Sequence, residues 1–262
     1  MKYNNHSGHL IFLIVASLSS SLSADSIVST QINSMGVINA IQNNTLNNNS
    51  IIIMQENTGS EANITIHQSN TKNSSISAIQ RNTTSAGSDN LIDLSQTDTI
   101  NSHIVVTHEN GGGNSLNINQ SGDKNNSTIN LMVMGSNNEV NIDQIDSPAG
   151  SQIDAVVEGN GNINQLLQDS AGYNSDMQLI QTGDYNQATM TQTRYSTLMS
   201  LSQEGDHNEA IMNQSSNGNA MDLVQQGDNN YADLFQGSAG NKASLQQIGD
   251  DNRTLLVQTG KN

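Results

Sequence analysis

The sequence predicts an all-β protein: a β-solenoid in which strand–turn–strand repeats stack into two facing parallel in-register sheets of about ten rungs. The first observation is composition: hydrophobic residues make up 33% and aromatic residues 3% of the 262 residues. That is too little for the thick core of an ordinary globular domain. The second is a glutamine that recurs at constant spacing in the C-terminal third. The third is an alternation of polar and apolar residues before each glutamine, which is typical of strands.

The regular repeat occupies residues 181–262. A glutamine recurs there at every eleventh position, and the members are Gln181, Gln192, Gln203, Gln214, Gln225, Gln236, Gln247 and Gln258. An asparagine lies five positions after a glutamine, and small or apolar residues lie seven and nine positions after it. The asparagines of this pattern include Asn186, Asn208, Asn230 and Asn252. These positions share one face of an extended strand, and we expect that face to point inward.

Alternate units differ, so the full repeat spans two units and holds two strands and two turns. A glycine follows every second glutamine by two positions, at Gly183, Gly205, Gly227 and Gly249. The apolar pairs alternate as well: Ala188 and Met190 in one unit are followed by Met199 and Leu201 in the next. Small residues facing larger ones allow two sheets to interdigitate.

Residues 31–180 repeat the same strand pattern with turns of variable length. The expected inward anchor positions are Gln31, Gln42, Gln55, Gln68, Gln80, Gln96, Thr107, Gln120, Val133, Gln144, Val157 and Gln168. The insertions belong in turns, because a one-residue slip within a strand moves every side chain to the opposite face. The single proline, Pro148, falls in one of the longer turns, where it removes no hydrogen bond of a sheet.

The N-terminus predicts a secreted protein. Residues 1–23 have the features of a signal peptide, with Leu10–Val15 as the short apolar region and small residues before a cleavage site at Ala24. Residues 24–30 form a short segment ahead of the first repeat. No other segment is long and apolar enough for transmembrane anchoring.

The charge balance excludes two classes of partner. The formal net charge is −16, with 8 basic residues against 24 acidic ones. A nucleic-acid partner requires a surface rich in Lys and Arg, and so does an anionic lipid surface. The absence of cysteine means that no disulfide holds the chain together.

The sequence predicts no enzyme, no cofactor and no catalytic or metal site. His103 and His108 have no accompanying cluster of ligands, and we expect them to face solvent or lie in turns. Asp250 and Asp251 fall where a turn is expected. The glycines at 111–113 are also a turn, because no helix follows them as a phosphate-binding loop would require.

The motif Gln-x-Gly-x-x-Asn-x-Ala-x-x-x-Gln at residues 181–192, 203–214 and 225–236 resembles the curlin repeat of bacterial curli subunits. The resemblance implies a β-solenoid that is secreted across the outer membrane and assembles into extracellular amyloid fibres, as a cell-surface fimbrium. It implies roles in biofilm matrix, adhesion and surface attachment. The implied partners are copies of the same chain, other curli subunits and a curli secretion system.

Inward glutamines and asparagines of successive rungs would lie above one another, so that their side-chain amides hydrogen-bond along the stack. The expected stacking residues are Gln31, Gln42, Gln181, Asn186, Gln192, Gln203, Asn208, Gln214, Gln225, Asn230, Gln236, Gln247, Asn252 and Gln258. The resemblance implies that those of the terminal repeats drive nucleation and growth. We also expect the acidic turns to repel one another and to slow association.

Two alternatives remain. One is a minor, nucleating curli subunit, because a serine of the family pattern, present at Ser175, is replaced by Thr197, Asn219 and Asn241, and residues 25–30 are too short for a glycine-rich export segment. The other is a monomeric secreted β-solenoid that acts as a binding module. A calcium-binding β-roll would need a nine-residue Gly/Asp repeat, an ice-binding face would need a repeated row of threonines, and neither pattern is present. A disordered linker would not keep an apolar register over so many units.

Overall fold

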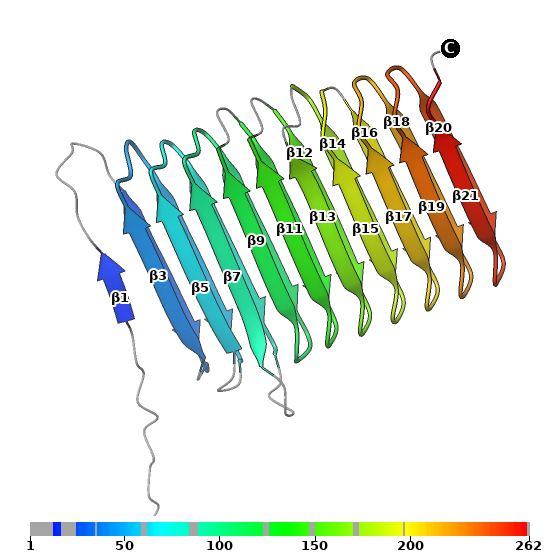
Figure 1. The fold of residues 1–262 in the computed structure, drawn as a ribbon. Helices are drawn as coiled ribbons and strands as arrows, with labels where there is room; N and C mark the ends of the chain where they lie inside the picture. The colour runs from blue at the N-terminus through cyan, green and yellow to red at the C-terminus, as the bar shows by residue number, and fades with distance from the viewer. Residues whose placement is uncertain are drawn as a thin grey trace, which may run out of the picture.

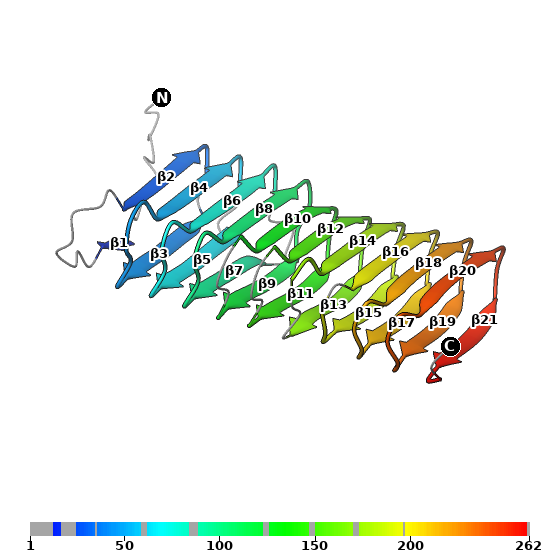
Figure 2. The ribbon, with the colours of Figure 1, turned by 90° about the horizontal axis from the view of Figure 1, so that it is seen from above.

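The computed structural model describes residues 13–16, 25–34, 36–58, 62–83, 89–122, 126–146, 150–169, 173–195 and 197–260. These residues form twenty-one strands and no helix. The odd-numbered strands make an eleven-stranded sheet, here called sheet A, and the even-numbered strands make a ten-stranded sheet, here called sheet B. The strands succeed one another along a single axis, and the two sheets face each other (Figures 1 and 2). The predicted fold class is therefore confirmed.

The strands of sheet A are β1 (Leu13–Ala16), β3 (Val37–Asn43), β5 (Ala62–Ser69), β7 (Asn90–Thr97), β9 (Ser115–Ser121), β11 (Glu139–Ile145), β13 (Ile163–Asp169), β15 (Gln187–Gln192), β17 (Glu209–Gln214), β19 (Tyr231–Gln236) and β21 (Arg253–Gln258). Those of sheet B are β2 (Ser26–Ile32), β4 (Ser50–Glu56), β6 (Ser75–Arg81), β8 (His103–Glu109), β10 (Thr128–Met134), β12 (Gln152–Glu158), β14 (Asp176–Thr182), β16 (Leu198–Glu204), β18 (Ala220–Gln226) and β20 (Lys242–Ile248).

Each rung from β2–β3 to β20–β21 contributes one strand to each sheet, and all neighbouring strands are parallel and in register. In sheet A, Gln192 lies opposite Gln168 on one side and Gln214 on the other. In sheet B, Gln203 lies between Gln181 and Gln225. Like residues therefore stack on like residues along the axis, as the spacing of the repeats predicts.

At the N-terminal edge of sheet A, β1 pairs with β3 in parallel. Most of the predicted signal peptide lies outside the described residues, and so does Pro148; cleavage before Ala24 stays a prediction. No helix among the described residues could cross a bilayer.

The core lies between the sheets and is one continuous cluster of small and apolar side chains. The strands alternate buried and exposed residues, with the buried set facing the opposite sheet. Ala188 and Met190 of sheet A and Met199 and Leu201 of sheet B are all buried in this cluster. The predicted inward apolar pairs of the regular block are thus in the core.

The predicted inward anchor Thr107 is wrong by one residue. His108, not Thr107, occupies the position that pairs with Gln80 on one side and Val133 on the other. His108 is fully buried, so the expectation that it faces solvent or lies in a turn is wrong too. The strand reads His-Ile-Val-Val-Thr-His and has apolar residues in both phases, so period two alone does not decide which face is buried.

The two turns of each rung are arches of different geometry, which explains why glycine follows only every second glutamine. Gly183, Gly205 and Gly227 lie in the arch from sheet B to sheet A, with φ between +109° and +118°. A Cβ on Gly205 would lie 2.3 Å from the carbonyl oxygen of Gly227 on the next rung. Both the dihedral and the close approach require glycine.

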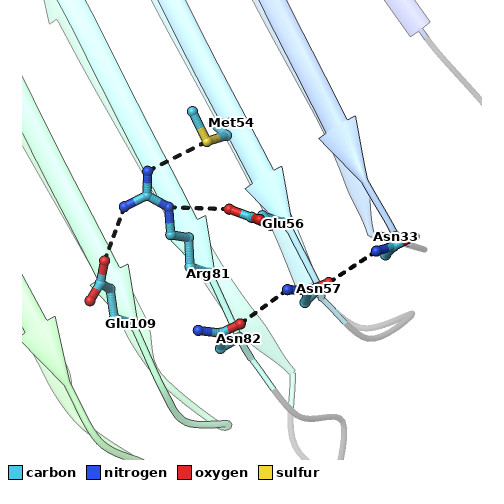
Figure 3. A network of polar contacts seen from close by, with 7 residues as sticks. All are labelled: Asn33, Met54, Glu56, Asn57, Arg81, Asn82 and Glu109. Carbon is cyan, nitrogen blue, oxygen red and sulfur yellow. Dashed lines mark hydrogen bonds and ion pairs between the residues drawn. The ribbon is translucent and has the colours of Figure 1, made fainter.

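Asparagine takes the corresponding position in the first rungs. Asn33, Asn57 and Asn82 have φ between +48° and +53°, a left-handed conformation that asparagine tolerates. Their side chains form a row in which Asn33 donates to Asn57 (3.3 Å) and Asn57 donates to Asn82 (3.2 Å). Figure 3 shows this row on the surface of three successive rungs.

We expect Gly205→Ala to lower the free energy of unfolding by about 3 kcal/mol or more, because alanine is strained at this φ and its Cβ meets a backbone carbonyl. The control is Gly218→Ala, where φ is +67° and the nearest atom to a Cβ is 4.0 Å away. It should cost about 1 kcal/mol. Denaturant unfolding at dilute concentration, followed by circular dichroism, measures both. Equal losses would refute the close-approach argument.

Candidate functional site

An unbroken ladder of glutamines runs along sheet A. In each pair, Nε2 of one glutamine donates to Oε1 of the glutamine on the next rung, at 2.7 to 3.3 Å. Its members are Gln42, Gln68, Gln96, Gln120, Gln144, Gln168, Gln192, Gln214, Gln236 and Gln258. A second amide hydrogen donates to a backbone carbonyl, as from Gln96 to Ser102 (3.0 Å). The buried amides are thereby satisfied, which avoids a cost of about 1–3 kcal/mol for each unpaired group.

The matching ladder of sheet B is broken into two parts. Gln31, Gln55 and Gln80 form the first part, with Gln31 donating to Gln55 (2.7 Å) and Gln55 to Gln80 (3.0 Å). The second part runs through Gln181, Gln203, Gln225 and Gln247, at 2.8 to 2.9 Å. Between them the anchor positions hold His108, Val133 and Val157.

Asn164 completes the second part of the sheet B ladder from the opposite sheet. Val157 lies beside Gln181 and has no side-chain donor for its Oε1. Asn164 takes a core position that other strands give to apolar residues, and its Nδ2 donates to Gln181 Oε1 at 3.0 Å. The sequence signal for this contact is an asparagine at an otherwise apolar position, beside two anchors that are valines.

A second ladder runs through the arch from sheet B to sheet A and is made of asparagines. Asn186 shows the pattern: its Oδ1 accepts the backbone N–H of Asn208 (2.9 Å), and its Nδ2 donates to the carbonyl of Gly205 (2.7 Å). The predicted members Asn186, Asn208, Asn230 and Asn252 all belong to it. Asn90, Asn114, Asn138 and Asn162 extend it upstream. The structure thus brings the expected stacking residues of the regular block together.

The upstream asparagines could have been found from the sequence. Asn114 lies two positions before the first buried apolar residue of its strand, Leu116, as Asn186 does before Ala188. Counting backward from the strand, rather than forward from the preceding glutamine through an arch of variable length, keeps this relation.

The arch from sheet A to sheet B also has a hydrogen bond between rungs, in which a side-chain oxygen accepts a backbone N–H of the next rung. Ser175 Oγ accepts the backbone N–H of Thr197 (3.4 Å), and Asn219 Oδ1 accepts that of Asn241 (2.9 Å). Serine, threonine and asparagine each supply a short side-chain oxygen at this position. The asparagine at position 219 therefore makes the same contact between rungs as the serine at position 175.

Four aspartates form a column on the arch from sheet B to sheet A, in which Asp184 and Asp206 are half-buried and Asp228 and Asp250 are exposed. The carboxylate of each accepts the backbone N–H of the preceding rung at 2.7 to 2.8 Å. The members are Asp184, Asp206, Asp228 and Asp250. Asp250 and Asp251 therefore lie in a turn, as predicted. The described residues contain no group of His, Asp or Glu that could hold a metal ion.

Stacking also places opposite charges side by side on the outer face of sheet B. Arg81 lies between Glu56 on one rung (3.5 Å) and Glu109 on the next (3.2 Å), as Figure 3 shows. Such exposed pairs contribute little each, typically up to about 1 kcal/mol.

The end rungs are the places where the ladders stop. The inward residues Ile27, Gln31, Leu256 and Gln258 are half-exposed, whereas those of inner rungs are buried. On the outer side of the last rung, Leu255 is 70% exposed. Among the described residues, the last rung thus has a strand edge, a half-exposed ladder glutamine and half-exposed core residues.

The last strands of the chain match the model of a known protein family. Residues 227–260, which hold β19, β20 and β21, match the family model described as the curlin associated repeat. This segment matches the curlin repeat. No curated protein and no solved structure gave a significant match. The curlin repeat and the β-solenoid together indicate a curli-like structural protein.

The matched segment contains members of the sheet A ladder, the sheet B ladder and the asparagine ladder. Gln236 and Gln258 belong to the sheet A ladder, Gln247 to the sheet B ladder, and Asn230 and Asn252 to the asparagine ladder. The glutamines and asparagines of the matched segment are thus residues that hydrogen-bond between rungs.

His108 is the one titratable side chain among the buried residues that the structure describes. Asn114 Nδ2 lies 2.8 Å from His108 Nε2. Within the described part of the chain, neither His108 Nδ1 nor Gln80 Nε2, its neighbour along the ladder, has a hydrogen-bond partner. Burial lowers the pKa of His108 from 6.5 to about 4, against a smaller opposing effect of the Gly135 backbone.

Because the folded pKa of His108 lies below the unfolded one, the neutral ring stabilises the fold fully above pH 6.5. That contribution is lost as the pH falls toward 4. We expect a loss of about 3 kcal/mol from this residue. His108→Gln should remove that part of the pH dependence and give Gln80 Nε2 a partner. Unfolding measured from pH 7.5 to 4, with exposed His103→Gln as control, tests this. Identical pH profiles for His108→Gln and the parent chain would contradict it.

Proposed function

We propose that the chain is the structural subunit of an extracellular, curli-like amyloid fibre that grows by head-to-tail stacking of solenoids. The observation that carries the proposal is the pair of unfinished end rungs, where Gln31 and Gln258 are half-exposed members of ladders that are buried elsewhere. Another copy offers at its own end the strand edge and glutamine that each ladder lacks.

The physical argument is that a junction between copies repeats a contact already made at every rung. Parallel in-register strands, glutamine ladders and a shared apolar core are the elements of a cross-β fibre. Joining the last rung of one copy to the first rung of another is a heterologous contact, and such contacts generate open filaments. The aspartate column would slow this step by repulsion, since four carboxylates lie on successive rungs.

The remaining parts of the proposal follow from the curlin repeat. A secreted fibre subunit would lose residues 1–23 on export, reach the surface through a curli secretion system and share its fibre with other curli subunits. Its roles would be structural and non-enzymatic: biofilm matrix, adhesion and attachment to surfaces.

A concentration series of purified residues 24–262 tests the proposal. We expect amyloid-dye fluorescence to rise after a lag, and aligned fibres to give a meridional reflection at about 4.8 Å, the spacing of stacked strands. A chain that stays monomeric for days at high concentration would reject the fibre and favour a monomeric binding module. Rapid seeding of a different subunit without self-assembly would indicate a nucleating role instead.

End-rung glutamines should control growth more than inner ones. We expect Gln31→Ala and Gln258→Ala to slow seeded elongation by about tenfold, since each removes a hydrogen bond of the junction worth about 1.5 kcal/mol. Gln144→Ala removes an inner ladder residue. It should lower the stability of the monomer and change the elongation rate less. Elongation rates measured with parent seeds compare the three variants, and equal slowing by all of them would argue against growth at the end rungs.

A further inference from the structure

Resting on the proposed fibre, we infer that a second copy docks in one register only, with β20 of one copy on β2 of the next and β21 on β3. The sequence separation between Gln31 and Gln247 equals the separation between Gln42 and Gln258. A single offset therefore brings the anchors of both sheets into line at once. The whole last rung, residues 241–258, then matches the first rung, residues 25–42, without an insertion.

The arch of the first rung is the feature that makes this match possible. Gln31 and Gln42 are eleven positions apart, as are Gln247 and Gln258. The second rung is different, because its anchors Gln55 and Gln68 are thirteen positions apart. The first rung thus has the short arch of the regular C-terminal block, with four residues between its strands at 33–36 and at 249–252. The longer arches begin one rung away from the junction.

The polar groups of the two ends are complementary in this register. Gln247 Nε2 donates to Thr254 Oγ1 (3.1 Å), whereas Gln225 at the same position of the previous rung donates to a glutamine. On docking, the Gln31 Oε1 of the next copy takes that place. In the arch, the backbone N–H of Gly36 donates to Ser34 Oγ (3.3 Å) in the single molecule. On docking it would donate to Asn252 Oδ1 instead, which continues the asparagine ladder by the pattern of the inner rungs.

In this register, the aspartate column ends at the junction without an additional negative charge. Asp228 donates its backbone N–H to Asp250, and the residue that follows Asp250 across the junction is Ser34. A serine hydroxyl accepts the corresponding N–H of Asp250 without adding a fifth carboxylate to the column. Repulsion at the arch is therefore no greater at the junction than inside one molecule.

Exposed apolar residues of the two ends meet one another on the outer faces. Ile248 is 64% exposed and would lie beside Ile32, which is 45% exposed. Val257, 55% exposed, would lie beside Ile41. Neighbouring strands place such side chains in contact, so both pairs are shielded from water on docking.

The competing arrangement is a copy turned by half a rung, with β21 on β2. It places Gln258 on Gln31 and therefore Val257 beside Thr30 instead of Ile41. In the structure, β1 lies against β3 at the docking edge, so the experiment uses residues 24–262, which lack β1.

The chain contains no cysteine, so paired cysteines can report the register. In-register neighbours on parallel strands lie about 4.8 Å apart, within the reach of a disulfide. Fibres are grown under reducing conditions from Val257→Cys/Ile41→Cys, from Ile248→Cys/Ile32→Cys and from Val257→Cys/Thr30→Cys, then oxidised and separated under denaturing conditions. All these positions face outward, and a mixture of single Val257→Cys and single Ile41→Cys chains should give covalent dimers and nothing longer.

We expect long covalent multimers from the first two double variants and at least tenfold fewer cross-links from the third. Fibres of either of the first two variants that fail to cross-link, or efficient cross-linking of the third, would overturn the inferred register while leaving the fibre itself in place. Absence of fibres from the unsubstituted chain would instead reject the proposed function. If one double variant does not assemble, the other one decides the register.

Discussion

The hydrogen bond from each sheet A glutamine to the glutamine of the next rung is the interaction on which the other features depend. It runs without a break from Gln42 to Gln258, and its members from Gln42 to Gln236 are buried in the core. Such a ladder exists only if every strand is parallel and in register, because a slip of one residue would turn each glutamine outward. The same stacking then requires glycine where arches approach closely and allows asparagine and aspartate columns elsewhere.

The fold and the ladders of the regular block follow from the sequence because strand and arch both have constant length there. A fixed spacing of eleven positions identifies Gln181 to Gln258 as anchors, and the positions between them identify the core. The two types of arch are visible as an alternation of glycine. In contrast, the dihedral and the close approach that make Gly205 necessary come from the next rung, and no local pattern contains them.

In residues 31–180 the arches vary in length, so the spacing between glutamines no longer identifies every inward position. His108 was missed because its strand has apolar residues in both phases and its anchor is neither glutamine nor aliphatic. The link from Asn164 to Gln181 joins opposite sheets, so it depends on which valine lies beside which glutamine rather than on spacing. The glutamine ladder of sheet A is continuous through this region, whereas that of sheet B is interrupted. Only the sheet A ladder therefore links the rungs there by glutamine side chains.

In the proposed fibre, the contact between two molecules is the same as the contact between two rungs. Hydrogen–deuterium exchange of residues 24–262, compared between dilute monomer and fibre, tests it most directly. We expect amides of β2, β3, β20 and β21 to exchange quickly in the monomer and to become as protected in the fibre as those of β10 to β13. If these end-rung amides still exchange quickly in fibres whose inner rungs are protected, the solenoids are not joined end to end.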